Sequence, residues 1–124
     1  WNDTEGELGA NVVVTNSSFG INYADCNSDP YPVWNDMYNT LGEAGILSVA
    51  ATMNINANVD EVGDVPTGCN SDYIISVTNT DRNDTKFISA AYGQESIDLG
   101  APGTSVCSTR PGDLISWSGE MVFI

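Results

Sequence analysis

The chain has 124 residues, 41% of them hydrophobic, which is enough for one domain with its own core. Seventeen acidic residues stand against three basic ones, and the formal charge is −14. This balance argues against nucleic acid as a partner, because phosphate binding needs a basic patch. No segment reaches the roughly 18 to 20 apolar residues that span a bilayer, so no membrane partner is expected either.

The first predicted strand covers residues 11–16, NVVVTN. Its β-branched run is typical of a parallel strand that is buried on both faces. The run ends at residues 17–20, SSFG, where small side chains let another chain approach the backbone. An ordinary exit from strand to loop is the alternative interpretation. Residues 20–32 are rich in Asn, Asp, Ser and Pro and are predicted to form a loop.

A helix is predicted to begin at Pro32, since proline suits the first helical turn. Its apolar residues recur at helical spacing and are expected to pack on the sheet; they are Trp34, Met37, Tyr38 and Leu41. Gly42 and Gly45 are expected to end the helix.

The segment 44–54, AGILSVAATMN, is interpreted as the central strand, in which Ile46, Leu47 and Val49 are buried. A strand, a helix and a second strand with short connections form a βαβ unit, so the two strands are predicted to be parallel. Ligands bind at the carboxyl ends of parallel strands. Asn54, at this strand end, is therefore the candidate donor to a negative charge that develops during a reaction.

Residues 54–72 form a long segment rich in Asn, Asp and Gly, and such loops are often binding walls. A third apolar strand is predicted over residues 73–80, YIISVTNT. A last apolar piece, residues 97–99, leads into a sharp corner formed by residues 100–103, GAPG.

The three cysteines are Cys26, Cys69 and Cys107. Cys26 and Cys69 both lie in loop-like surroundings, so a disulfide between them is favoured, with three free thiols as the open alternative. The chain has no histidine and no CxxC pair, so no zinc site is expected. No cofactor is predicted; structural calcium is left unassigned, because no D-x-D-x-D-G loop occurs.

Four segments in order resemble the subtilisin-like serine peptidases, or subtilases. Residues 16–20, NSSFG, are similar to the family's N-x-S-[FLW]-G, and residues 49–54, VAATMN, to its VAAAGN. Residues 74–80 resemble the strand that follows, and residues 98–109, DLGAPGTSVCST, resemble its APG corner. The resemblance covers roughly residues 10–112 and points to the central portion of the catalytic domain.

The resemblance implies an α/β fold with a doubly wound, mainly parallel sheet, and peptide-bond hydrolysis by a Ser-His-Asp mechanism. Asn54 takes the position of the amide in the oxyanion hole. Ser18, Phe19 and Gly20 match the backbone strip that pairs with an extended substrate. Ala51 and Thr52 match a wall of the primary specificity pocket.

The triad itself is absent. No histidine is present, and the family's Asp and His would precede the segment that begins at residue 11. Ser118 and Gly119 resemble the start of the nucleophile motif, but residues 120–122 depart from it. Met53 also replaces the family's usual glycine. Residues 1–124 are therefore expected to be a single, incomplete catalytic domain that is inactive by itself.

The first functional hypothesis is a fragment of a secreted serine endopeptidase that acts on polypeptides. Its extracellular location is inferred from the resemblance and from the acidity. The alternative is a non-catalytic module that binds peptides or is purely structural. Because a parallel sheet needs cover on both faces and only one long helix is predicted, self-association is also expected.

Overall fold

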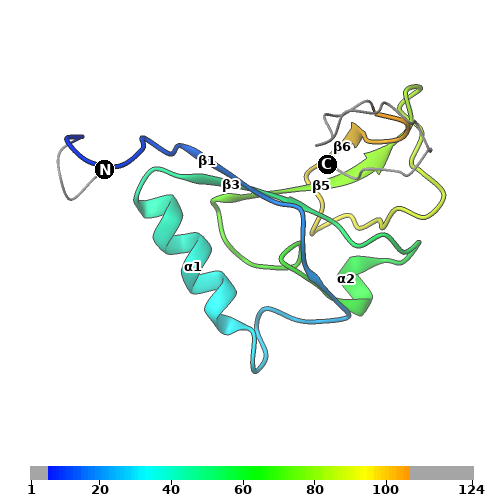
Figure 1. Cartoon of the computed structure of the whole chain (residues 1–124). Helices are drawn as coiled ribbons and strands as arrows, with labels where there is room; N and C mark the ends of the chain where they lie inside the picture. The colour runs from blue at the N-terminus through cyan, green and yellow to red at the C-terminus, as the bar shows by residue number, and fades with distance from the viewer. Residues whose placement is uncertain (1–5, 107–124) are drawn as a thin grey trace, which may run out of the picture.

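Residues 6–106 are described in the computed structural model, and a four-stranded sheet lies at their centre (Figure 1). Its strands are β1 (Val14–Ser17), β3 (Leu47–Ala51), β5 (Ile74–Thr80) and β6 (Leu99–Pro102). Their order is β1-β3-β5-β6, and all three neighbouring pairs are parallel. The predicted α/β class, with a mainly parallel and incomplete sheet, is confirmed.

Two segments that the sequence indicates as loops contain short elements. β2 (Ile21–Asn22) pairs antiparallel with β4 (Asp64–Val65), and α2 (Val59–Val62) precedes β4. The loop interpretation of residues 20–32 and 54–72 is therefore wrong at these positions. Elements of two to four residues are too short to leave a periodic pattern in the sequence.

Helix α1 (Pro32–Glu43) begins at the predicted proline, and Tyr38 on it is buried. Trp34 and Leu41 are half-buried against the same core, but Met37 is 41% exposed, so its predicted place in the core is wrong. Gly42 lies inside the helix rather than at its end, so this part of the prediction is wrong. A Cβ at Gly42 would collide with the side chain of Tyr73, which explains why the position lacks one. The helix ends just before Gly45, which has a left-handed φ of 82°.

The two faces of the sheet have different chemistry. On the face toward α1 the strands carry small hydroxyl side chains, and Ser17, Ser48 and Ser76 are all buried. The Tyr38 hydroxyl donates to Ser17 Oγ at 3.3 Å, and Ser76 Oγ donates to the carbonyl of Thr67 at 3.2 Å. These hydrogen bonds satisfy the polar groups and allow close packing of helix and loops on this face.

The opposite face carries the larger apolar side chains, since strand residues alternate between faces. They are Val14, Leu47, Val49, Ile75, Val77 and Leu99. α1 and α2 both lie on the other side of the sheet, and no helix in residues 6–106 covers this face (Figure 1). Val14 on this face is accordingly 53% exposed, and residues 12 and 13, which precede β1, are 45% and 57% exposed. The prediction that this strand is buried on both faces is therefore wrong.

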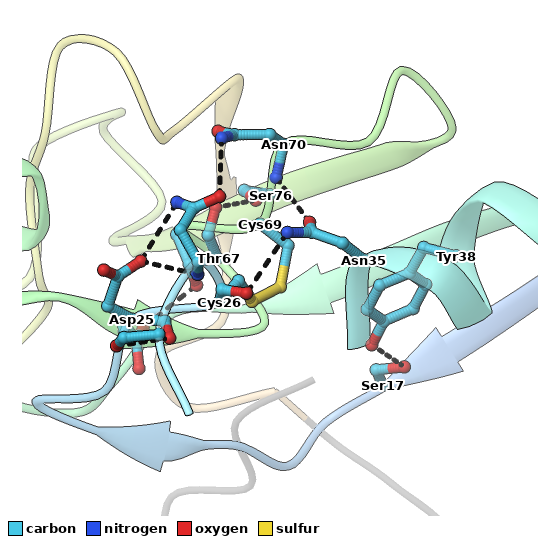
Figure 2. The surroundings of a disulfide bond; sticks show 12 residues. Ser17, Asp25, Cys26, Asn35, Tyr38, Thr67, Cys69, Asn70 and Ser76 are labelled. Atoms are coloured by element: carbon cyan, nitrogen blue, oxygen red, sulfur yellow. Dashed lines mark hydrogen bonds between the residues drawn. A yellow bond between two sulfur atoms is a disulfide. The ribbon is translucent and has the colours of Figure 1, made fainter. Parts of the chain in front are cut away.

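A disulfide between Cys26 and Cys69 lies beside α1 and joins the loop after β2 to the loop after β4 (Figure 2). Both cysteines are buried in one cluster with Ala24, Tyr38 and Val65. The bond links residues 43 positions apart, which corresponds to a stabilisation of about 4 kcal/mol from the loss of chain entropy in the unfolded state. Cys107 lies outside the described residues.

An asparagine network surrounds the disulfide (Figure 2). The Asn35 side chain donates to the carbonyl of Cys26 at 3.3 Å and accepts from the amide of Asn70 at 2.7 Å. The Asn70 side chain donates to that of Asn27 at 3.1 Å. The two disulfide-bearing loops are thus connected to each other and to α1. In residues 6–106, no helix has the length and apolar character to cross a membrane.

Replacing Gly42 by alanine is expected to lower the free energy of unfolding by about 1–3 kcal/mol. Alanine is intrinsically the better helix former by about 1 kcal/mol, but its Cβ would collide with Tyr73. Urea unfolding followed by circular dichroism measures the change. Thr40→Ala, an exposed substitution on the same helix, is the control and is expected to change stability by less than about 0.5 kcal/mol. A Gly42→Ala chain as stable as wild type would contradict the packing described here.

Candidate functional site

A cavity of about 190 Å³ lies at the carboxyl ends of β1 and β3, and we call it the strand-end cavity. The residues that line it are Ser18, Phe19, Gly20, Asn22, Ala51, Thr52, Met53, Asn54, Ile55 and Asp64. Because β1 and β3 are parallel, with Ser17 beside Ala50, the segments that follow them lie side by side. All residues that the sequence predicts for substrate and oxyanion contacts therefore line one cavity.

The backbone strip, residues 18–20, forms one wall. Its main chain is open: within residues 6–106, neither Ser18 nor Phe19 makes a backbone-to-backbone hydrogen bond. The Phe19 side chain is 60% exposed and contacts the Trp34 ring, with centroids 6.0 Å apart. At Gly20 a Cβ would collide with the carbonyl oxygen of Val65, so only glycine lets the strip pass this close to β4.

Asn54 follows β3 directly and is exposed. Its side-chain amide makes no hydrogen bond to any residue in the described part of the chain, so it remains available to a ligand. Gly103, in the predicted corner, is buried and donates its N–H to Asn79 Oδ1 at 3.0 Å. Gly103 also lines a smaller cavity together with Thr52 and Asn54, so the corner adjoins the candidate amide.

Met53, which replaces a glycine expected from the resemblance, holds the loop in place. It is 5% exposed and packs with Val59 and Ala91 in a second core cluster. Its N–H donates to Asp64 Oδ2 at 2.8 Å, and its carbonyl accepts from the N–H of Ala91 at 3.3 Å. The residue before Asn54 is thus anchored through its side chain and both backbone groups.

Asp64, on β4, is the ionisable residue of the strand-end cavity, and it was not predicted from the sequence. It is 2% exposed, and its Oδ2 also accepts from Thr67 Oγ1 at 2.9 Å. Burial raises the pKa of the Asp64 carboxyl above its ordinary value of 3.8, while the hydrogen bonds from Met53 and Thr67 act in the opposite direction. One of 17 acidic residues, in a segment without periodicity, gives no sequence signal of its own.

Other predicted features lie elsewhere. Cys26 and Cys69 form the disulfide described above and do not line the cavity. Residues 118–122, which partly resemble a nucleophile motif, lie outside the described residues. Within residues 6–106, no group of three or more His, Cys, Asp or Glu side chains is placed to hold a metal ion.

A scan against protein-family models finds no match, and neither does a search of curated proteins. Solved structures do match. The prenylagaramide maturation protease PagA aligns with a TM-score of 0.66 and 19% identity over 82% of this chain and 35% of its own. The epidermin leader peptide processing serine protease from Staphylococcus aureus aligns with a TM-score of 0.61 and 21% identity, over 74% of this chain and 27% of its own. A lanthipeptide protease aligns with a TM-score of 0.63 and 19% identity, over 74% of this chain and 29% of its own.

The expectation of a generic subtilisin-like peptidase family is corrected by these matches. The matching structures are proteases of a more specific kind, described by their action on leader peptides, on lanthipeptides or in prenylagaramide maturation. At 19% to 21% identity the likeness establishes the fold. The chain spans 27% to 35% of the length of these proteases.

Two substitutions of Asp64 distinguish its hydrogen-bond acceptor from its negative charge. Asp64→Ala leaves Met53 N–H without its acceptor and leaves Thr67 Oγ1 with only the longer contact, 3.5 Å, to the carbonyl of Ala51. The free energy of unfolding is therefore expected to fall by about 1–3 kcal/mol. Asp64→Asn keeps an acceptor oxygen and is expected to destabilise less. Urea unfolding of the three chains at about pH 7 tests this order. Equal stability of the Ala and Asn variants would contradict the acceptor role.

The raised pKa of Asp64 also predicts how the stability of the fold changes with pH. Because the folded-state pKa of Asp64 is raised, the native state binds a proton more readily than the unfolded state. The contribution of this group to stability therefore increases as pH falls through the raised pKa toward 3.8. The stability of wild type relative to Asp64→Asn should rise on acidification. A relative stability that falls over this range would contradict the raised pKa.

Proposed function

We propose that this chain forms the substrate-binding centre of a peptide-processing protease, and that by itself it binds peptides without cleaving them. The observation that carries the proposal is the strand-end cavity. The resemblance implies substrate contacts at the backbone strip and at the end of β3, and both line this one cavity.

In the proposed binding mode, an extended peptide lies along the backbone strip, whose main-chain groups are open. Ala51 and Thr52 leave room for one substrate side chain beside Asn54. In a complete enzyme the Asn54 amide would donate to the oxyanion of the tetrahedral intermediate, a contact worth about 10²–10³ in rate. The chain has no histidine as a general base, so no turnover is expected from it alone.

A polypeptide substrate is supported by the matching proteases, one of which processes a leader peptide. The chain corresponds to about a third or less of each, so the remaining machinery of the proposed enzyme would come from other segments. An extracellular or otherwise oxidising location is part of the proposal, because a buried disulfide and a charge of −14 suit such an environment.

A non-catalytic peptide-binding or structural module is the second candidate. The missing histidine favours it. Reading the coding sequence on both sides of this segment discriminates the two, since an upstream Asp and His together with a downstream serine motif would restore the triad.

Peptide binding is expected to perturb the amide NMR signals of residues 18–20 and 51–54 when an alanine-rich octapeptide is titrated into the chain. Ala51→Leu should abolish these shifts, because the longer side chain fills the strand-end cavity. Ala101→Leu, at another half-buried strand position outside the cavity, should preserve them. Shifts that are absent, or that survive Ala51→Leu, would overturn the proposal.

Self-association through the apolar sheet face is also proposed for the isolated chain. Multi-angle light scattering should show a mass that rises with concentration, since nothing in residues 6–106 covers this face with a helix. Val49→Lys should reduce the association by placing a charge on the face. Val33→Lys, at an exposed position of α1, is the control and should not. A monomer at every concentration would rule the association out.

A further inference from the structure

We propose that the strand-end cavity takes a cationic side chain of the lysine or arginine type, and that Asp64 selects it. The inference rests on the proposed peptide-binding function and adds the substrate class to it. It is argued from the burial of Asp64, from its hydrogen bonds and from the other residues of the cavity.

Within residues 6–106, Asp64 is a buried carboxylate without a counter-charge. It is 2% exposed, and a buried charge is costly unless it is paired. Among the residues that line the cavity, Asp64 is the only one with a formal charge. Lys86 is engaged elsewhere, with its Nζ donating to Asn56 Oδ1 and to the carbonyls of Phe87 and Ala90. Arg82 lies beside Asp81.

One oxygen of this carboxylate is free to accept. The bonds from Met53 N–H and Thr67 Oγ1 both go to Oδ2, and no hydrogen bond from residues 6–106 reaches Oδ1. In the described part of the chain, the fully buried side-chain polar atoms without a partner are Asn79 Nδ2 and Thr80 Oγ1. Asp64 Oδ1 is not among these atoms, and it accepts no hydrogen bond from residues 6–106. Asp64 lines the strand-end cavity, and Oδ1 is therefore placed to accept from a ligand in it.

The size and walls of the cavity suit one long side chain. Its volume of about 190 Å³ is below the roughly 300–1,000 Å³ of pockets for whole small molecules. Ala51 and Gly20 provide small walls, along which the aliphatic stem of a lysine or arginine can pack. The charged end would then meet Oδ1 in a charge-assisted hydrogen bond.

A purely structural role does not account for the charge. Anchoring Met53 N–H and Thr67 Oγ1 requires only an acceptor oxygen, which asparagine also supplies. A carboxylate accepts stronger hydrogen bonds than an amide oxygen, but its charge adds a desolvation cost that asparagine would avoid. The charge is explained if a cation completes the site.

The test compares two octapeptides that differ at one position, arginine in one and its neutral isostere citrulline in the other. NMR titration gives the dissociation constants for wild type, Asp64→Asn and Asp72→Asn; Asp72 is exposed and lies outside the cavity. Wild type should bind the arginine peptide about 10-fold more tightly. Asp64→Asn should lose this preference while retaining citrulline binding, and Asp72→Asn should keep it.

Equal binding of both peptides to wild type, with shifts at residues 18–20, would overturn the cationic preference and leave the peptide-binding function standing. No binding of either peptide would overturn both. A preference that Asp72→Asn loses as much as Asp64→Asn would reflect the overall charge of −14 and would also overturn the inference. If Asp64→Asn does not fold, the ¹³C shift of the wild-type Asp64 carboxyl decides: the arginine peptide alone should move it.

Discussion

The hydrogen bond between the Asp64 carboxylate and the Met53 amide is the interaction on which the candidate site depends. It joins the end of β3 to β4 at 2.8 Å in a buried setting. β4 in turn pairs with β2, where Ile21 lies beside Val65, and β2 follows the backbone strip directly. One carboxylate thus connects the three segments that form the walls of the strand-end cavity. Its burial is the energetic cost of that arrangement.

The two faces of the sheet differ in what packs against them. Small hydroxyl residues such as Ser48 and Ser76 allow α1 and the disulfide-linked loops to pack closely on one face. The larger apolar side chains, Leu47 and Val77 among them, point to the other face. A domain that ended with this sheet would leave that face to solvent. The matched region covers 27% to 35% of the length of the matching proteases.

The sequence was sufficient to predict the parallel sheet and that residues 18–20 and Asn54 lie at one edge of it. Solid apolar runs mark β3 and β5, and the end of β3 can be read to within a residue or two, so Asn54 and the strip 18–20 could be brought to one edge. Pro32 likewise marks the start of α1. These predictions succeeded because each depends on local pattern and on the handedness of the βαβ unit.

The rest depends on contacts that no local pattern carries. In the sequence, nothing distinguishes Asp64 from the other acidic residues of its segment. Only the folded structure places it in a buried position beside Met53. The exposure of residues 12–14 reflects what lies over β1, since a β-branched run looks the same in an edge strand as in a buried one. The generic family assignment failed for a related reason: four short segments describe strand ends and turns, which proteases of different specificity share.

The central claim is that the strand-end cavity holds a buried and uncompensated carboxylate. A pH titration of the free chain, followed by the ¹³C chemical shift of the Asp64 carboxyl carbon, tests it most directly. The account predicts a pKa above the ordinary 3.8, in contrast to Asp81, whose pKa is lowered by hydrogen bonds from the backbone of Thr85 and Asn83. An Asp64 carboxyl that titrates at or below 3.8 would contradict it.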